Sequence, residues 1–181
     1  MLFGATAPAW VGSWRRTMAV AAGALAGGIL LAGAWTYVVP REIRTEIIVD
    51  GSTEQVWSVL TDVAEYPAWN PAIVALDGSL EPGETVEVHL VAGGSELVFR
   101  PVVQVVEPGR ELRWLGRLPG VFEGTHSFVL EPVGDRRTRL LHGERFSGIA
   151  APFFPLGDTR RAFEAMNDAL AQRVAADDAT R

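Results

Sequence analysis

The stretch DGSTEQVWSVLTDVAEYPAWNP, residues 50–71, decides the fold because its signals fix where two helices begin and end. Ser52 is a favourable N-cap and Gln55 follows three residues later, so the pair predicts a capping box with a helix starting at Thr53. That helix has apolar residues at helical spacing on one face, namely Val56, Trp57, Val59 and Leu60.

A second, shorter helix is predicted directly after the first. Thr61 and Asp62 offer another cap, and residues 63–66 are long enough for about one more turn. Pro67 is predicted to end this turn, since proline disfavours helix in the residue before it. Trp69 would then stand at the corner between helix and strand.

Outward from this stretch, the chain reads as strands separated by turns rich in glycine, proline and aspartate. The predicted strands cover residues 44–49, 73–76, 85–91, 97–106, 111–117, 121–130 and 138–147. No helix intervenes between most of them, so six or seven strands are expected to form an antiparallel sheet.

The last predicted element is a helix over residues 158–176 with Asp158 as its cap. Its apolar residues form one stripe, made of Phe163, Met166, Leu170 and Val174. The concave face of a curved sheet is the natural partner for that stripe, which predicts an α+β helix-grip fold with a cavity where helix and sheet diverge. The apolar loop 148–156 would close the mouth of that cavity or pack under the helix.

The order of these motifs resembles the START-like superfamily, also called SRPBCC domains, which includes polyketide cyclase/dehydrase and birch-pollen-allergen-like proteins. The resemblance covers residues 44–174 and is carried by VWSVLTD (56–62), YPAWNP (66–71), GTHSF (124–128), LEP (130–132), TRL (138–140) and GERF (143–146). It implies the helix-grip fold and, in many such domains, binding of a small apolar molecule. It implies no single activity, because one scaffold hosts unrelated functions.

Residues 1–40 form a separate unit before the domain of residues 41–181. Residues 18–39 include no charge and would span about 33 Å as a helix, enough to cross a bilayer. A retained membrane anchor is favoured because the apolar run continues through Trp35 and Tyr37, which suit an interface. A signal peptide cleaved near Ala34, after the Ala-Gly-Ala pattern, is the alternative, and a buried core helix is the third interpretation.

Charge near the span predicts its orientation. Arg15 and Arg16 precede it without any acidic residue, whereas Arg41 and Arg44 are interleaved with glutamates. The positive-inside rule counts only Lys and Arg, so the two ends are nearly balanced. The amino terminus adds one more positive charge before the span, which predicts a cytoplasmic N-terminus and a domain on the extracytoplasmic side.

Composition excludes several function classes. The chain has no cysteine, so it has no disulfide, thiol nucleophile or thiolate metal site. Two of its 16 basic residues and none of its 22 acidic ones precede residue 41, which leaves the domain with a net charge of −8. An acidic domain without a basic stripe is a poor match for nucleic acid.

Strand parity predicts which side chains line the cavity, because alternate residues share a face. In one middle strand Leu97, Phe99, Val103 and Val105 group together. The predicted ligand-binding residues are Trp69, Phe99, Trp114, Phe122, His126, Phe128, His142, Glu144, Phe146, Phe163 and Met166. This mostly apolar lining with a few polar groups is typical of a pocket for a hydrophobic ligand.

Glu144 and His126 are the candidates for catalysis. A carboxyl group in an apolar pocket next to an imidazole is a plausible acid/base pair for a carbonyl or enol. The alternative is a structural role, with Glu144 paired to Arg100, Arg113 or Arg145 and with the histidines as satisfied core groups.

No metal or cofactor is predicted. The three histidines come from separate strands, and His89 is expected to point outward. Nor does the sequence contain a glycine-rich phosphate loop, a nucleophile elbow or an HExxH motif.

Three hypotheses on function follow. The first is a membrane-tethered domain that binds a lipid, isoprenoid or polyketide-like molecule. The second is a cyclase/dehydrase-like enzyme that uses Glu144 and His126. The third is an interaction module of the cell envelope, which a filled core would favour over a cavity.

Overall fold

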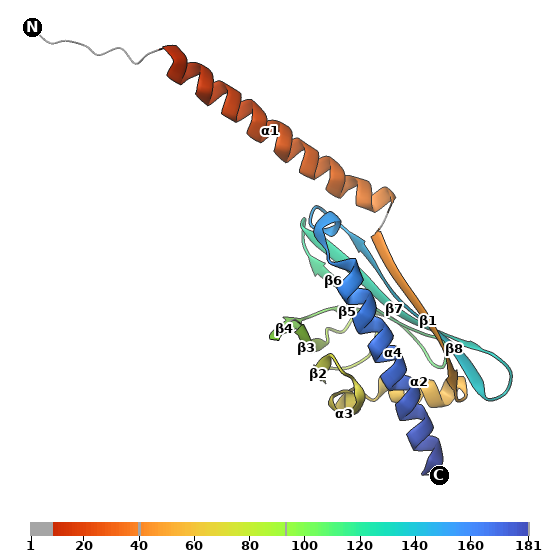
Figure 1. The fold of residues 1–181 in the computed structure, drawn as a ribbon. Helices are drawn as coiled ribbons and strands as arrows, with labels where there is room; N and C mark the ends of the chain where they lie inside the picture. Colours follow the sequence, from red (N-terminus) through yellow and green to blue (C-terminus); the bar gives the residue numbers. More distant parts are fainter. Residues whose placement is uncertain (1–8, 40, 93, 181) are drawn as a thin grey trace, which may run out of the picture.

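The computed structural model describes residues 9–39, 41–92 and 94–180. A long N-terminal helix, α1 (Ala9–Val38), projects away from an α+β domain that contains the other elements (Figure 1). Within the described residues α1 includes one segment, Arg16–Val38, that is long and apolar enough to cross a membrane.

The capping box at the start of α2 (Thr53–Thr61) is confirmed. The backbone N–H of Gln55 donates to Ser52 Oγ at 3.3 Å, and the backbone N–H of Ser52 donates to Gln55 Oε1 at 2.9 Å. Two backbone donors that the helix itself cannot satisfy are thus bonded by side chains, which fixes the first turn.

The prediction for Pro67 was wrong. A 3₁₀ turn, η1 (Val63–Glu65), is followed at once by a one-turn helix, α3 (Tyr66–Trp69), and Pro67 lies inside the first turn of α3. Proline fits there because the N–H groups of a first turn have no partner within the helix. The Asp62 side chain also makes no capping hydrogen bond.

Among the described residues, eight strands form two antiparallel sheets. The larger sheet has the order β1-β8-β7-β6-β5 and the smaller one β2-β3-β4. The strands are β1 (Arg41–Asp50), β2 (Ile73–Asp77), β3 (Glu87–Ala92), β4 (Ser95–Phe99), β5 (Val102–Glu107), β6 (Glu111–Leu118), β7 (Phe122–Pro132) and β8 (Arg137–Ser147).

The strand predicted over residues 97–106 is in fact two strands, β4 and β5, which belong to different sheets. The break falls at Arg100 and Pro101, where proline offers no N–H to a ladder. Leu97 and Phe99 therefore lie on a different strand from Val103. This split also raises the count above the six or seven strands that were predicted.

The C-terminal helix α4 (Leu156–Ala179) lies across the larger sheet, in the helix-grip arrangement (Figure 1). It is longer than predicted at both ends, and Pro155 rather than Asp158 holds the N-cap position. Its predicted apolar stripe is buried as expected.

The buried apolar residues fall into two clusters. The larger one joins α2 and α4 to the sheets and includes Trp114, Phe128 and Met166. The smaller one consists of Ile43, Phe146, Ala151 and Phe163, with Phe122, Phe154 and Leu156 packed against it. The hydrogen-bonded polar side chains of His142 and Asn167 lie beside both clusters. The His142 ring stacks on Phe128 of the first cluster and on Phe163 of the second.

Candidate ligand-binding site and its polar network

The pairing of β7 with β8 brings the predicted site residues together. His126 lies opposite Glu144, and Phe128 lies opposite His142. Directly opposed residues project from the same face of an antiparallel pair, so these four side chains share the inner face that strand parity predicted.

A chain of buried hydrogen bonds joins β8, α4 and β1. His142 Nδ1 lies 2.7 Å from Asn167 Oδ1, and Asn167 Nδ2 donates to Thr45 Oγ1 at 2.9 Å. Thr45 Oγ1 donates in turn to the carbonyl oxygen of His142 at 2.9 Å. All three side chains are buried, so the chain satisfies groups that would otherwise be costly to bury.

These hydrogen bonds assign the tautomers of both histidines. Because the Asn167 amide N–H donates to Thr45, its oxygen is the acceptor for His142, and His142 Nδ1 carries a proton. His142 Nε2 is then the lone-pair nitrogen of a neutral ring. It lies 2.9 Å from His126 Nε2, which must be the donor in this contact.

Glu144 lies at the accessible end of the network. Its Oε2 is 3.5 Å from His126 Nδ1, the ring nitrogen that is not used toward His142. With its Nε2 proton directed at His142, a neutral His126 presents the lone pair of Nδ1 to the Glu144 carboxylate. The two side chains are 14% and 18% exposed, which leaves this end open to proton exchange.

Burial holds the pKa of His142 well below its ordinary value of 6.5, and the neighbouring His126 adds to that effect. The hydrogen bond to Asn167 acts in the opposite direction and is outweighed. His142 therefore stays neutral at pH 7 and serves as a fixed acceptor for His126.

Aromatic rings hold the two imidazoles in place. The His142 ring stacks on Phe163 with centroids 4.1 Å apart and on Phe128 at 4.4 Å. The His126 ring lies 5.4 Å from Trp114 and 4.9 Å from Phe163. The arrangement gives an apolar wall with oriented polar atoms, the combination expected of a site that binds an apolar molecule in one pose.

Gly124 makes room for the Glu144 carboxylate. A Cβ atom at this position would lie 2.4 Å from Glu144 Oε1. The missing side chain in β7 therefore sets where the carboxylate can rest beside His126.

Other predicted lining residues occupy different places. Phe122 and Phe146 both pack on Phe154 in the smaller apolar cluster. Met166 is buried in the larger cluster. Trp69 is half-buried there against Tyr66, with ring centroids 4.9 Å apart.

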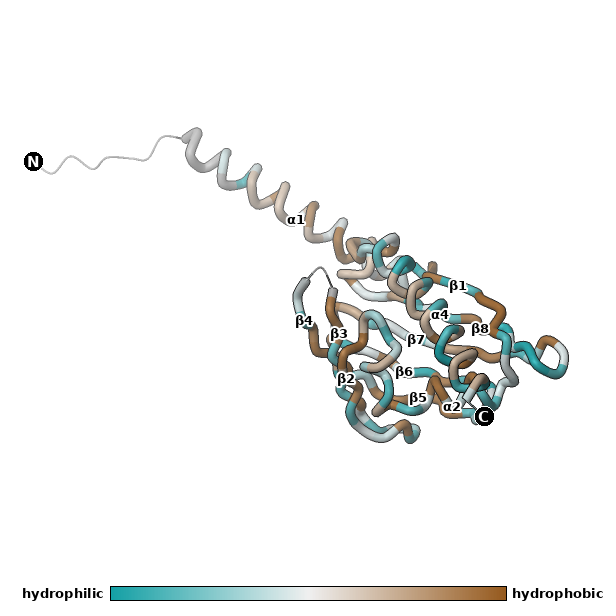
Figure 2. The backbone as a smooth tube through the Cα atoms, turned by 60° about the horizontal axis from the view of Figure 1, so that its bottom comes forward, coloured by the Kyte–Doolittle hydropathy of each residue, from teal (hydrophilic) through white to brown (hydrophobic). Residues whose placement is uncertain are grey.

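Phe99 lies on β4 of the smaller sheet. It pairs with Val88, and Leu97 pairs with Leu90. Val88 and Leu90 belong to the core side of that sheet, so Leu97 and Phe99 share its inner face. They nevertheless remain 44% and 47% exposed. Figure 2 shows β3 and β4 carrying brown, hydrophobic segments.

A shallow hollow of about 430 Å³ lies on the opposite face of the larger sheet from α4. Gly143 is one of its lining residues, and a Cβ atom there would lie 2.7 Å from the carbonyl oxygen of Ile43. Its walls include Arg44, Glu46, Ser127 and Val129, which project outward by strand parity. This hollow is not the cavity that the sequence predicted between sheet and helix.

Two of the three arginines that were predicted as possible partners for Glu144 pair elsewhere. Arg100 forms an ion pair with Glu87, and Arg113 forms one with Glu111. His89 contacts Glu87 and Glu96 on the outer face of β3, as predicted.

Sequence reasoning missed Asn167 and Thr45. A signal for Asn167 was available, because it stands next to Met166 within the apolar stripe of α4. A polar residue on the buried face of a helix needs a partner. Thr45 lies two residues after Ile43 on the inner face of β1, so it too is a polar residue on a buried face that needs a partner.

Residues 40–177 match the sequence family described as polyketide cyclase / dehydrase and lipid transport. A search of curated protein sequences gave no match.

Solved structures share the fold at low sequence identity. A START superfamily protein from Mycobacterium smegmatis is 20% identical with a TM-score of 0.62, covering 74% of this chain and 97% of its own. The Zhui aromatase/cyclase from Streptomyces sp. R1128 is 18% identical with a TM-score of 0.57, covering 75% and 94%. A norcoclaurine synthase point mutant from Thalictrum flavum is 16% identical with a TM-score of 0.60, covering 77% and 96%.

Proposed function

We propose, from the premise that this chain belongs to the polyketide cyclase/dehydrase and lipid transport family, that it is a membrane-tethered domain that binds a small hydrophobic molecule between sheet and α4. The observation that carries the proposal is the inner face of β4. Leu97 and Phe99 are apolar and face the core side, yet nearly half of each side chain is uncovered. A small apolar ligand would remove this surface from water.

The polar network supplies orientation. His126 and Glu144 are partly exposed next to Trp114 and Phe128, so a ligand that carries one hydroxyl or carbonyl group would find a donor and an acceptor within an apolar wall. This fits a lipid, isoprenoid or polyketide-like compound better than a sugar or nucleotide, which would need many more polar partners.

Tethering is proposed from α1. Its Arg16–Val38 segment is long and apolar enough to span a bilayer, and only 6% of its most apolar window is buried by the protein. A core helix of a soluble domain would be mostly buried, whereas this helix offers nearly all of its apolar surface to another apolar medium. The charge distribution favours the extracytoplasmic side for the domain.

Native mass spectrometry of the full chain released from lipid nanodiscs, followed by solvent extraction, tests the binding proposal. We expect an apolar molecule that co-purifies at a stoichiometry of one. Phe99→Ser, which would make the uncovered apolar face of β4 more polar, should reduce its occupancy several-fold, whereas Glu164→Gln on the exposed face of α4 should not. A ligand-free chain whose thermal unfolding no lipid or polyketide shifts would favour the interaction module instead.

An enzyme of the cyclase/dehydrase kind is the second candidate, and the Glu144–His126 contact favours it. A carboxylate beside an imidazole at an accessible end of a fixed network is an arrangement that general acid/base catalysis on a carbonyl can use. Glu144→Gln should abolish turnover of a bound polyketide-like substrate and change its affinity by a few-fold at most. Retained turnover would remove Glu144 from any catalytic role.

A further inference from the structure

One end of the domain is built around the last turns of α1. Thr36 is buried, and its hydroxyl donates to the carbonyl of Gly33 at 2.6 Å and accepts from the backbone N–H of Gly148 at 2.9 Å. Gly33 lies against the backbone of Ile149, since a Cβ atom there would be 2.4 Å from Ile149 Cα. The helix thus docks closely on the loop that joins β8 to α4.

That loop is bonded in turn to the β6–β7 turn. The N–H of Ala150 donates to the carbonyl of Val121 at 3.0 Å, and the N–H of Val121 donates to the carbonyl of Leu118 at 3.0 Å. Arg41 donates to the carbonyls of Ala151 and Pro152, which closes the loop from the other side. Residues 118–122, residues 148–156 and the end of α1 therefore form one hydrogen-bonded unit.

The two loop segments of this unit are apolar and uncharged. Neither the segment 118–122 nor the segment 148–156 has an acidic or basic residue, although the whole domain carries a net charge of −8. Phe153 is 71% exposed and Leu118 is 59% exposed. Directly behind them Phe122 and Phe154 stack, with ring centroids 5.4 Å apart.

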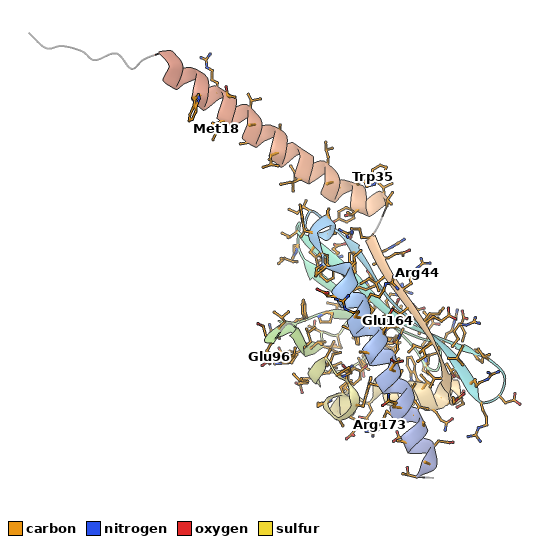
Figure 3. The ribbon with its side chains drawn as sticks, in the orientation of Figure 1. Met18, Trp35, Arg44, Glu96, Glu164 and Arg173 are labelled. Atoms are coloured by element: carbon orange, nitrogen blue, oxygen red, sulfur yellow. The ribbon has the colours of Figure 1, made fainter. Side chains whose placement is uncertain are left out.

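The length of α1 sets the depth of this unit. From Met18, where the uncharged run begins, to Gly33 a helix rises about 22 Å, whereas a hydrocarbon core is about 30 Å thick. Sliding the helix further would draw Arg15 and Arg16 into lipid, at high cost. In Figure 3 Met18 marks the far end of the span, and Trp35 lies where α1 meets the domain.

We propose that residues 118–122 and 148–156 form a rim that enters the lipid bilayer beside α1, so that the apolar cluster of Phe122, Phe146 and Phe154 opens toward lipid instead of water. The inference rests on the proposed tether, and it names the bilayer as the source of the ligand. The cluster includes Phe163, which stacks on His142, so it connects the rim with the polar network.

The absence of native cysteine allows single probes at chosen depths. Phe153→Cys and Leu118→Cys would report the rim, Leu25→Cys the middle of the span, and Asp135→Cys the β7–β8 turn, which lies far from α1 (Figure 1). Each full-length variant is labelled with an environment-sensitive NBD probe and reconstituted into phosphatidylcholine vesicles. Lipids with a spin label near the headgroup or deep in the acyl chain then quench probes at the corresponding depth.

We expect the probes at positions 153 and 118 to show blue-shifted emission and several-fold stronger quenching by the shallow spin label than the probe at position 135. Rim probes that match position 135, while the probe at position 25 is quenched by the deep label, would overturn the rim and leave the tether standing. A blue shift without lipid quenching would indicate contact with a second copy and would also overturn it. An unquenched probe at position 25 would overturn the tether itself. Ligand binding is measured separately by mass spectrometry, so the two proposals can fail independently.

Discussion

His142 is buried and hydrogen-bonded at both ring nitrogens, which makes it sensitive to pH. Its pKa is lowered in the folded chain and stands near 6.5 in the unfolded chain, so below pH 6.5 the unfolded chain binds a proton that the folded chain does not. We expect stability to fall with pH from 6.5 downward, by up to about 1.4 kcal/mol per pH unit from this residue. Urea unfolding of the full chain between pH 5 and 8 measures the slope.

The control for this prediction separates His142 from the other histidines. His142→Gln should flatten the slope below pH 6.5. His89→Gln should not, because the carboxylate partners Glu96 and Glu87 raise the pKa of this partly exposed histidine, which gives a contribution of opposite sign. An unchanged slope in His142→Gln would mean that other groups control the pH dependence.

A substitution at Gly124 tests the Glu144–His126 contact without replacing either of those two residues. Gly124→Ala would push the Glu144 carboxylate away, since the added Cβ would lie 2.4 Å from its oxygen. That carboxylate ends a flexible side chain, so we expect a small loss of stability and a clear change in the ring chemical shifts of His126, measured by NMR. Gly116→Ala on the neighbouring strand is the matched control, because its Cβ would meet its nearest atom at 3.9 Å. Identical His126 ring chemical shifts in the two variants would contradict the contact between His126 and Glu144.

The shared inner face of Glu144 and His126 could be predicted from the sequence, because strand parity needs only local spacing. Asn167 and Thr45 could not be assigned to them, because that pairing depends on how α4 lies across β1 and β8. The parity of Leu97 and Phe99 also predicted their face, whereas their exposure depends on how far the smaller sheet stands from α4.

Single substitutions can disrupt the contact between α1 and the β8–α4 loop. Gly33→Leu would collide with Ile149, and Thr36→Val would remove the acceptor for the Gly148 N–H. We expect amide hydrogen exchange of residues 148–151 to rise several-fold in both variants, measured by mass spectrometry. Gly28→Leu, with nothing within 4 Å of the added Cβ, should leave exchange unchanged. Equal exchange in all three variants would show that the helix does not dock.

Two element boundaries show where local reasoning stops. The capping box of α2 was predictable because all its atoms lie within four residues. Pro67 was predicted to end a helix but lies in the first turn of one, because a proline fits there as well as after a helix. Pro101 lay inside a strand that was predicted to be continuous, although the chain breaks there into β4 and β5. Whether the strands on either side of Pro101 continue one sheet depends on long-range pairing, which the sequence pattern does not encode.

For the whole molecule, fold class followed from the order of motifs, because a capped helix, a run of turns and strands, and a long amphipathic helix leave few compact arrangements. The relation of the anchor to the domain did not follow. Residues 148–156 were predicted to cover a cavity or to pack under α4. Their contact with Gly33 and Thr36 joins two parts of the chain that composition had separated at residue 40.

This contact bears on whether α1 is retained. Signal cleavage after Ala34 would remove Gly33 and leave Thr36 at a new terminus, although Gly33 lies against Ile149 and residues 32–34 are helical. We therefore expect the membrane-purified chain to keep residues 18–34 and to resist alkaline extraction. Ala34→Leu abolishes the Ala-Gly-Ala pattern. We expect the intact mass of this variant to differ from that of the wild type only by the substitution. A wild-type mass that lacks residues 1–34, with a longer chain in Ala34→Leu, would establish a signal peptide and leave the rim of Leu118 and Phe153 without its neighbouring helix.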